Sequence, residues 1–344
     1  MSILRRPNCP RAIQRAMKLP RLRLPHLAAG AAAIAGVCVA LAGHGASAQT
    51  QRTLKLVVPS APGGATDILA RLLGDQIGRT QGATVVIDNR PGAGEVIGTE
   101  AAARAAPDGN TLLFAANPFL INPHLRKVNY DPLTSFGPIC QLATAPTLIV
   151  VRAASSYHSL ADVLEAARAK PGTLTMASIG PGSPFHLGFE KLKRMAKADM
   201  TFIPYPGNGP SVNALLGDHV TMMFGTYANV AEHLKTGNLR AIAATTRKRF
   251  EELPDLPTVA GSGFPDYQVP AWFAAFAPAQ TPHQMVSELA GWLTAAMQAA
   301  EVKQKLLIQG LYPSGLCGEQ LAIALRTEFE DLGRIIRESH IKAE

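Results

Sequence analysis

Short apolar runs alternate with helix-period stretches along most of the chain. The apolar runs, each typical of a buried β-strand, are residues 56–58, 84–87, 111–114, 147–151, 174–177, 201–205, 220–224, 239–245 and 272–276. Between them, apolar side chains spaced three or four apart, or alanine-rich sequence, predict helices in residues 66–77, 98–106, 160–169, 184–192, 281–307 and 321–336. This alternation predicts an α/β protein with parallel strands and with helices on both faces of the sheet.

The order of these elements also predicts two lobes. The strand at residues 147–151 is the first passage from one lobe to the other, and the strand at 272–276 carries the chain back. We therefore predict a first lobe from residues 49–149 and 270–344 and a second lobe from 150–269, each a sheet flanked by helices. Two connecting strands at one hinge allow the lobes to close on a ligand between them.

A glycine loop follows the first apolar run. Pro62, Gly63 and Gly64 lie between the strand and a helix, and Thr66 and Asp67 are predicted as the cap and first turn of that helix. A strand, a small-residue loop and a helix start place unpaired N–H groups and the positive end of the helix dipole at one point, which suits an anion. The alternative is an ordinary turn between a strand and a helix that binds nothing.

A second loop of the same kind makes the anion hypothesis stronger. Gly180 and Gly182 form a tight turn after the strand at 174–177, Ser183 is predicted as the N-cap of a helix, and Pro184 is its first residue. Two such loops, far apart in the sequence, suit two lobes that face one cleft.

The positive charge of the sequence is concentrated at its start. The formal net charge is +8, but the first 48 residues hold seven of the 33 basic residues and none of the 25 acidic ones. The remainder therefore carries 26 basic and 25 acidic residues and is nearly neutral. Without a global basic surface, a nucleic-acid partner has no support.

The same 48 residues predict a secretory signal peptide. A basic region precedes the apolar run 27–42, and Ala46, Ser47 and Ala48 form a small-residue cleavage site. We expect cleavage after Ala48 and a periplasmic mature protein. The apolar run is short compared with the roughly 20 residues that a membrane span needs. Met17 is an alternative to Met1 as the start of the chain.

Two cysteines, Cys140 and Cys317, remain after such cleavage. An oxidising compartment permits a disulfide between them, but the sequence gives no distance, so both the paired and the free state stay open.

The motifs of common enzymes are missing or incomplete. Gly92, Gly94 and Gly98 follow a strand as in a dinucleotide-binding turn, but their spacing is one residue too long. Ser183 lacks the flanking glycines of a nucleophile elbow, and His186 is expected to contact the loop or the helix cap. The histidines show no metal-ligand spacing, so we predict no metal, no cofactor and no catalytic residue.

Together these features resemble the substrate-binding proteins of tripartite tricarboxylate transporters, the Bug or TctC family. The resemblance extends in order over essentially the whole mature chain. The matching segments include VVPSAPGGATDILAR (57–71), VIDNRPGAGEVIGTEAAARAAPDGNTLL (86–113), INPHL (121–125), YDPLTSF (130–136), IGPGSPFHLGFE (179–190), IPYPGNGPSVNALLGDHVTMMF (203–224), GNLRAIAATTRKR (237–249), LPDLPTVAGSGFPDY (253–267) and WFAAFAPAQTP (272–282). Three positions depart from the family pattern: Ser60 replaces an aromatic residue, Glu95 a small residue and Pro206 a lysine.

The resemblance implies a two-lobed type II periplasmic-binding-protein fold and a receptor without catalytic activity. It implies that a small carboxylate is held between the lobes, mainly by backbone N–H groups, and is delivered by a monomer to one large and one small membrane subunit. The expected ligand-binding residues are Ser60, Pro62, Gly63, Gly64, Thr66, Asp67, Gly180, Gly182, Ser183, His186, Tyr205, Thr226, Tyr227 and Asn229, with Asp67 ordering the first loop and the last three placed on the strand after Val220.

Two other functions stay open at this point. A periplasmic sensor or accessory protein that signals to a membrane partner would bind a similar ligand. An enzyme on the same fold, such as a ligase or lyase of small acids, would turn its ligand over, although no nucleophile or metal site supports it. The identity of the ligand is left open by the sequence.

Overall fold

The computed structural model describes residues 52–249, 251–269 and 271–342. The predicted signal peptide and its cleavage site after Ala48 lie outside the described residues. The described residues belong to one compact unit, which contains two β-sheets.

The first sheet is mixed, with strand order β11-β4-β10-β3-β1-β2. Strands β1, β2 and β3 are parallel, whereas β10 is antiparallel to both β3 and β4. The strands are β1 (Thr53–Val58), β2 (Thr84–Asn89), β3 (Thr111–Ala116), β4 (Phe136–Ala145), β10 (Ala271–Pro278) and β11 (Tyr312–Pro313).

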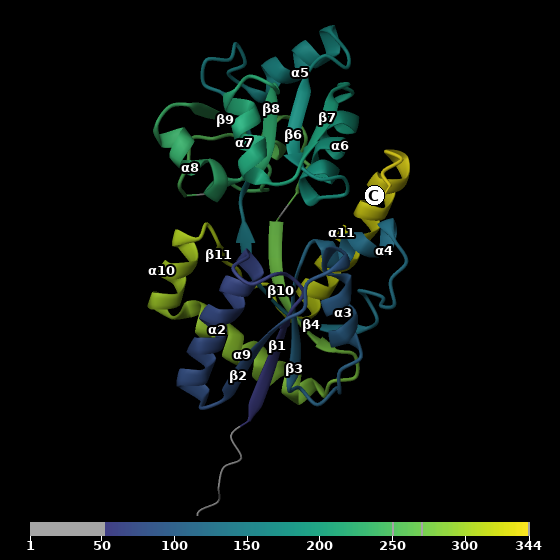
Figure 1. Cartoon of the computed structure of the whole chain (residues 1–344), viewed down its shortest axis with the longest axis vertical. Coiled ribbons are helices and arrows are strands. Elements are labelled where there is room, and N and C mark those ends of the chain that lie inside the picture. The colour runs from purple at the N-terminus through teal and green to yellow at the C-terminus, as the bar shows by residue number, and fades with distance from the viewer. Residues whose placement is uncertain (1–51, 250, 270, 343–344) are drawn as a thin grey trace, which may run out of the picture. The chain divides into compact units, whose positions relative to one another are not determined.

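Helices cover both faces of this sheet (Figure 1). One face packs against α2 (Ala65–Gln81), α9 (His283–Gln298) and α10 (Ala300–Ile308). The other packs against α3 (Val96–Ala103), α4 (Pro118–Leu125) and α11 (Gly318–Glu338). Helix α11 follows the apolar pattern predicted from the sequence, since Leu321 and Leu325, which lie on one face of the helix, are both buried against the sheet.

The second sheet has strand order β7-β6-β8-β5-β9. Its strands are β5 (Thr147–Arg152), β6 (Thr175–Ile179), β7 (Thr201–Tyr205), β8 (Met222–Thr226) and β9 (Leu239–Ala244). Strand β6 is parallel to β7 and β8, and β5 is antiparallel to β8 and β9. Helices α5 (Leu160–Ala169) and α6 (Pro184–Ala196) cover one face, and α7 (Asn208–Leu216) and α8 (Tyr227–Lys235) cover the other (Figure 1).

The two sheets are connected twice, close to one point. Strand β4 ends at Ala145 in the first sheet, and β5 begins at Thr147 in the second. On the return, the Thr245 hydroxyl lies 3.2 Å from the carbonyl of Thr147 and 3.1 Å from that of Val269. This buried side chain therefore ties the outgoing segment to the returning one. The lobe boundaries at residues 149/150 and 269/270 stay a prediction, although residues 147–149, assigned to the first lobe, pair within the second sheet.

The expectation of parallel sheets was wrong in part. Strands β5 and β10 run against their neighbours because each enters its sheet directly from the other sheet, without the crossover helix that makes consecutive strands parallel.

Several elements differ from the sequence expectation. Strand β4 and helices α4 and α8 were not predicted; Pro118 and Pro123 in α4 hide its periodicity. The single helix expected over residues 281–307 is two helices, because Ala299 has an extended backbone with ψ of 125°.

Cys140 and Cys317 form a disulfide, which settles the alternative that the sequence left open. Cys140 lies in β4, and Cys317 is the N-cap residue of α11. The bond therefore anchors the last helix to the first sheet.

Over the described ranges, none of the helices is both long enough and apolar enough to span a bilayer.

Candidate functional site

The carboxyl ends of the parallel strands in the two sheets face each other. In the first sheet, the end of β3 at Ala116 pairs with Phe273, two residues from the start of β10, which the chain enters from the second sheet. In the second sheet, the end of β8 at Thr226 pairs with Thr147, the first residue after the crossing. Ligands of open α/β sheets bind beside the carboxyl ends of strands, and the loops after β1, β2, β6, β7 and β8 all lie at these edges.

The first glycine loop, residues 60–67, follows β1 and is held by the carboxylate of Asp67. This side chain is buried, accepts a hydrogen bond from the Gly63 N–H at 2.9 Å and forms an ion pair with Arg71 at 2.9 Å. Asn89, at the end of the neighbouring strand β2, donates to Asp67 at 2.9 Å and to the Ser60 carbonyl at 3.2 Å. Asp67 therefore positions the loop, and its oxygens are occupied by protein donors.

The charge on Asp67 is stabilised by these contacts. Burial raises the pKa of this carboxyl, but the hydrogen bonds from Arg71, Gly63 and Asn89 outweigh burial and hold the pKa at about 2. Asp67 is consequently ionised at neutral pH.

The predicted start of α2 needs a correction. The N-cap is Gly64, which has no side chain to close the helix, and Thr66 and Asp67 are the second and third residues of the helix. Among the described residues, the N–H groups of Ala65, Thr66 and Asp67 form no hydrogen bond. This helix start therefore leaves three N–H groups without a protein partner at the positive end of the helix dipole, an arrangement that suits an anion.

The second glycine loop, residues 180–183, follows β6. Ser183 is the N-cap of α6, as predicted, because its hydroxyl accepts a hydrogen bond from the His186 N–H at 3.2 Å. However, the loop N–H groups are used within the protein. Gly180 donates to the Tyr205 carbonyl, Gly182 donates to His186 Nδ1 at 3.1 Å, and Ser183 donates to the Gly180 carbonyl. A ligand that binds these N–H groups has to replace internal bonds.

His186 holds this loop from the first turn of α6. Its ring stacks on Phe202 at 3.9 Å between centroids, and its Nδ1 accepts from Gly182 only while that nitrogen carries no proton. Burial, followed by the charge of Lys193, lowers the pKa of His186 to about 4. The ring is therefore neutral at pH 7, and the expected contact with the loop is confirmed.

The remaining predicted site residues lie at the same edge of the second sheet. Tyr205 ends β7, and Thr226 ends β8. Tyr227 and Asn229 belong to α8, so their predicted placement on a strand was wrong; β8 stops at Thr226 because the chain turns into a helix there. The amide of Asn229 donates to the Thr226 hydroxyl at 2.7 Å.

Several unsatisfied polar groups lie at these two edges. Helices α2, α7 and α8 begin there without a side-chain cap, as do most of the described helices, whereas α6 is capped by Ser183. Five buried side-chain atoms lack a hydrogen-bond partner in the described part of the chain, Arg152 Nε and Ser339 Oγ among them. The other three are oxygens at these edges: Ser60 Oγ after β1, Thr147 Oγ1 at the crossing and Asn208 Oδ1 after β7. Because buried polar atoms are almost always paired, these oxygens favour a polar ligand at this place.

Sequence reasoning missed two residues that shape the loops. Asn89 ties Ser60 to Asp67, and only its position at the end of a strand beside β1 signals this. Leu125, at the end of α4, lies where a side chain on Gly182 would have to be. Gly182 has φ of +73°, so the position favours glycine for two reasons. Among the described residues, no hydrogen bond joins the first loop to the second.

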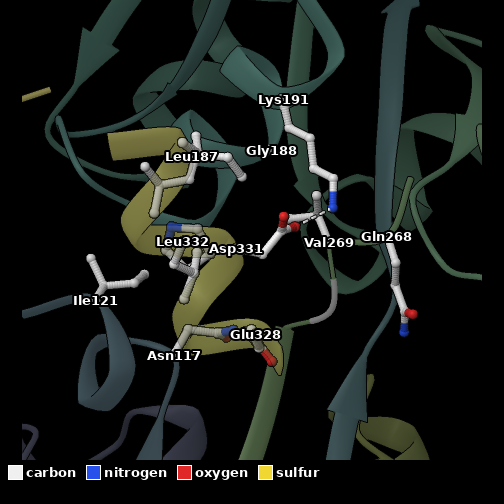
Figure 2. A pocket seen from close by; sticks show the side chains of 12 residues that line it. Asn117, Ile121, Leu187, Gly188, Lys191, Gln268, Val269, Glu328, Asp331 and Leu332 are labelled. Atoms are coloured by element: carbon white, nitrogen blue, oxygen red, sulfur yellow. Dashed lines mark hydrogen bonds and ion pairs between the residues drawn. The ribbon is translucent and has the colours of Figure 1, made fainter. Parts of the chain in front are cut away.

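A small cavity lies between α6 and α11, and Pro184, which directly follows the second loop, is one of the residues that line it. Its volume is about 40 Å³, whereas ligand pockets usually measure about 300 Å³ or more. Figure 2 shows Lys191 and Asp331 pointing toward one another across it, with the Glu328 side chain beside Asn117. Glu328 also accepts from the Trp272 ring N–H at 3.0 Å, and its pKa is raised by burial to about 7. This cavity lies where α6, which packs on the second sheet, meets α11, which packs on the first. We call this contact between α6 and α11 the seam.

Within the described ranges, no three His, Cys, Asp or Glu side chains are grouped to hold a metal ion.

Comparison with known proteins gives consistent matches. The model of the tripartite tricarboxylate transporter family receptor, TctC, matches residues 69–341. BugT of Bordetella pertussis is 33% identical over 317 residues, which covers 90% of this chain and 97% of BugT.

Solved structures agree with the sequence matches. The periplasmic binding protein BugD is 31% identical with a TM-score of 0.67, over 85% of this chain and 99% of BugD. The R. palustris protein Rpa4515, whose structure holds adipate, is 30% identical with a TM-score of 0.70, over 86% of this chain and 99% of that protein.

Proposed function

Because the chain belongs to the tripartite tricarboxylate transporter receptor family, we propose that it is a periplasmic solute-binding protein that captures a small organic carboxylate between its two lobes. The observation that carries the proposal is the open start of α2, where three successive N–H groups, those of Ala65, Thr66 and Asp67, lack a partner in the described chain. A carboxylate satisfies such groups and is favoured by the helix dipole. The adipate held by Rpa4515 supports this class of ligand.

We propose distinct roles for the two glycine loops. The first loop, residues 60–67, binds the carboxylate with the unpaired N–H groups at the start of α2, that of Thr66 among them. Asp67 holds this loop in place, Gly64 is the N-cap, and Pro62 and Gly63 form the outer turn. The second loop contributes the N–H groups of Gly180, Gly182 and Ser183 after their internal bonds open. Tyr205, Thr226, Tyr227 and Asn229 add selectivity from the second sheet.

We also propose how the receptor is exported and to what it delivers its ligand. The chain is exported by residues 1–48, which are cleaved after Ala48, and it acts as a monomer. It delivers the unchanged ligand to one large and one small membrane subunit and performs no catalysis. If the bound ligand is recovered in unaltered form, that result supports a receptor over an enzyme.

The experiment is a thermal-shift screen followed by calorimetry. Residues 49–344 are unfolded and refolded to remove ligand carried over from expression, and are then tested against monocarboxylates, dicarboxylates, tricarboxylates and amino acids. A ligand that binds only the folded state stabilises it by about 2.7 kcal/mol at a hundredfold excess over Kd, which raises the midpoint measurably. A carboxylate that binds supports the proposal, and failure of every carboxylate contradicts it.

The variant Gly182→Val tests the place of binding. A side chain here meets Leu125 and enters the face of the loop, so we expect affinity to fall at least about tenfold. Gly237→Val is the matched control, since Gly237 has a similar φ of +71° with nothing within 4 Å. Equal affinity in both variants removes the second loop from the site.

A further inference from the structure

The turn that follows β2 has an unusual backbone. Four successive residues, from Gly92 to Glu95, have positive φ, with values of 131°, 48°, 63° and 80°. Two of them, Ala93 and Glu95, carry side chains, which this region of backbone conformation disfavours. Strain of this kind persists where the surroundings impose it, and it concentrates at functional sites.

The turn is pinned on both sides. From α4, Asn122 donates to the Gly94 carbonyl at 2.7 Å and Arg126 donates to that of Ala93 at 3.4 Å. From α3, the Thr99 hydroxyl donates to the Glu95 carbonyl at 2.8 Å. These bonds fix the backbone of Glu95.

Contacts of the flanking helices place the turn beside both glycine loops. On α3, a Cβ at Gly98 would lie 2.7 Å from the Cα of Pro59, so this helix start packs against the residue just before Ser60. On α4, Leu125 stands one helical turn beyond Asn122 and meets Gly182 of the second loop. The turn with Glu95 therefore lies close to the first loop and shares α4 with the second.

The carboxyl group of Glu95 has no partner. The side chain is half-buried, and it forms no hydrogen bond or ion pair with any residue that the structure describes. Burial raises its pKa to about 7. By contrast, the carboxylate of Glu100, one turn further along, accepts from the N–H and the amide of Asn129 at 2.9 and 3.0 Å. The oxygens of Glu95 are not among the fully buried atoms that lack a partner, so a donor group on a ligand can reach them and form a charge-assisted hydrogen bond in a half-buried setting.

We infer that Glu95 recognises the far end of the ligand, and that the ligand is a carboxylate whose other end carries an amino group. This inference rests on the proposed function, in which the glycine loops bind the carboxylate end. An ammonium group gives Glu95 a charge-assisted partner, whereas a second carboxylate places like charges together in a site of low dielectric. Glu95 is therefore a specificity-determining residue.

The test uses sets of probes with the same chain length and different ends. Succinate, glutarate and adipate are compared with their ω-amino analogues and with the plain monocarboxylates by calorimetry at pH 8, where Glu95 is mostly ionised. We expect the best ω-amino acid to bind at least about tenfold more tightly than the dicarboxylate of its length. In Glu95→Gln this preference falls to about threefold or less, because the charge is gone while the size is kept. Glu100→Gln, the control on the same helix, keeps the preference of the native chain.

The outcomes separate this inference from the proposed function. If carboxylates bind but the dicarboxylates bind more tightly, or if Glu95→Gln keeps the preference, the role of Glu95 is overturned and the receptor function stands. If none of the probes binds and the wider carboxylate screen is also empty, the proposed function fails and the inference fails with it. If only the wider screen yields a ligand, and this ligand lacks a donor group at its far end, the inference alone is overturned.

Discussion

Lys191 Nζ lies 2.6 Å from Asp331 Oδ2, and this ion pair joins α6 beside the second sheet to α11 beside the first. Both side chains are largely buried, with 16% and 25% of their surface exposed. Asp331 also pairs with Arg334 on its own helix. Ile121 on α4 and Leu187 on α6 belong to one buried apolar cluster with Ile335 and Ile336 of α11, which extends the contact between the helices of the two sheets. The pair therefore stabilises the arrangement in which α6 packs against α11.

We predict that Asp331→Asn lowers the free energy of unfolding by about 1–3 kcal/mol, because it leaves the largely buried ammonium of Lys191 without its ion-pair partner. Urea unfolding measures the loss. The matched control is Asp218→Asn, which breaks the more exposed pair with Arg152 and is expected to cost less than about 0.5 kcal/mol. Equal losses in the two variants contradict a special role for the seam.

Asp67 and its ion-pair partner are predicted to differ strongly in importance. Asp67→Asn replaces one acceptor oxygen by a donor amide, which then faces donors from Gly63, Arg71 or Asn89. We expect a loss of about 1–3 kcal/mol in stability and faster hydrogen exchange at the Gly63 N–H. Arg71→Gln is expected to cost less than about 1 kcal/mol, since Arg71 is half-exposed.

Chemical denaturation and amide exchange on the two variants check this prediction together. If Arg71→Gln loosens the Gly63 N–H as much as Asp67→Asn does, the loop is held by the ion pair and not by the hydrogen bonds to the carboxylate.

The lowered pKa of His186 predicts that the folded protein loses stability in acid. Its pKa in the folded protein is about 4, against about 6.5 in an unfolded chain. Between these values the unfolded state binds a proton that the folded state does not, so this contribution is fully present above pH 6.5 and is lost as pH falls toward 4. The loss amounts to at most about 3 kcal/mol. Protonation also removes the acceptor for the Gly182 N–H.

The measurement is the free energy of unfolding at several pH values for the native chain and for His186→Gln. Because other groups titrate in both proteins, the difference between the two curves isolates His186. We expect the difference to change through the range from pH 6.5 to 4. A difference that stays constant over this range contradicts the neutral, loop-holding state of the ring.

Local patterns predicted the elements that carry their own signals. Helix α5 has the predicted bounds because Ser159 and Asp162 form a capping box before an apolar stripe. Strand β7 also begins and ends as predicted. Strand β4 was missed because Gly137, Pro138 and polar residues interrupt its apolar pattern, and its pairing with β10 comes from a segment more than a hundred residues away.

The site residues also divide into those that local sequence signals place and those whose contacts depend on tertiary packing. Gly63, Gly182 and Ser183 could be placed in tight turns from their residue types, and Ser183 caps its helix as the sequence indicates. That the Gly180 N–H is used by Tyr205 depends on the register of β6 against β7, which the pattern does not fix. The unpaired state of Glu95 likewise follows from how α3 and α4 pack, and not from its neighbours in sequence.

The disulfide between Cys140 and Cys317 gives the last prediction. The bond closes a long loop, with a sequence separation of 177 residues, and it fixes the N-cap of α11 on β4. Cross-links over long loops restrict the unfolded chain, so we expect reduction or Cys140→Ala with Cys317→Ala to lower the unfolding free energy by about 2–4 kcal/mol. Protein produced as residues 49–344 contains only these two cysteines, so it is expected to contain no free thiol, and thiol titration under denaturing conditions checks this. Two reactive thiols in this protein, purified under oxidising conditions, contradict the bond. Ligand affinity is expected to change less than about threefold in the double variant, because the bond lies within the first sheet and its helices, and both glycine loops keep their own hydrogen bonds.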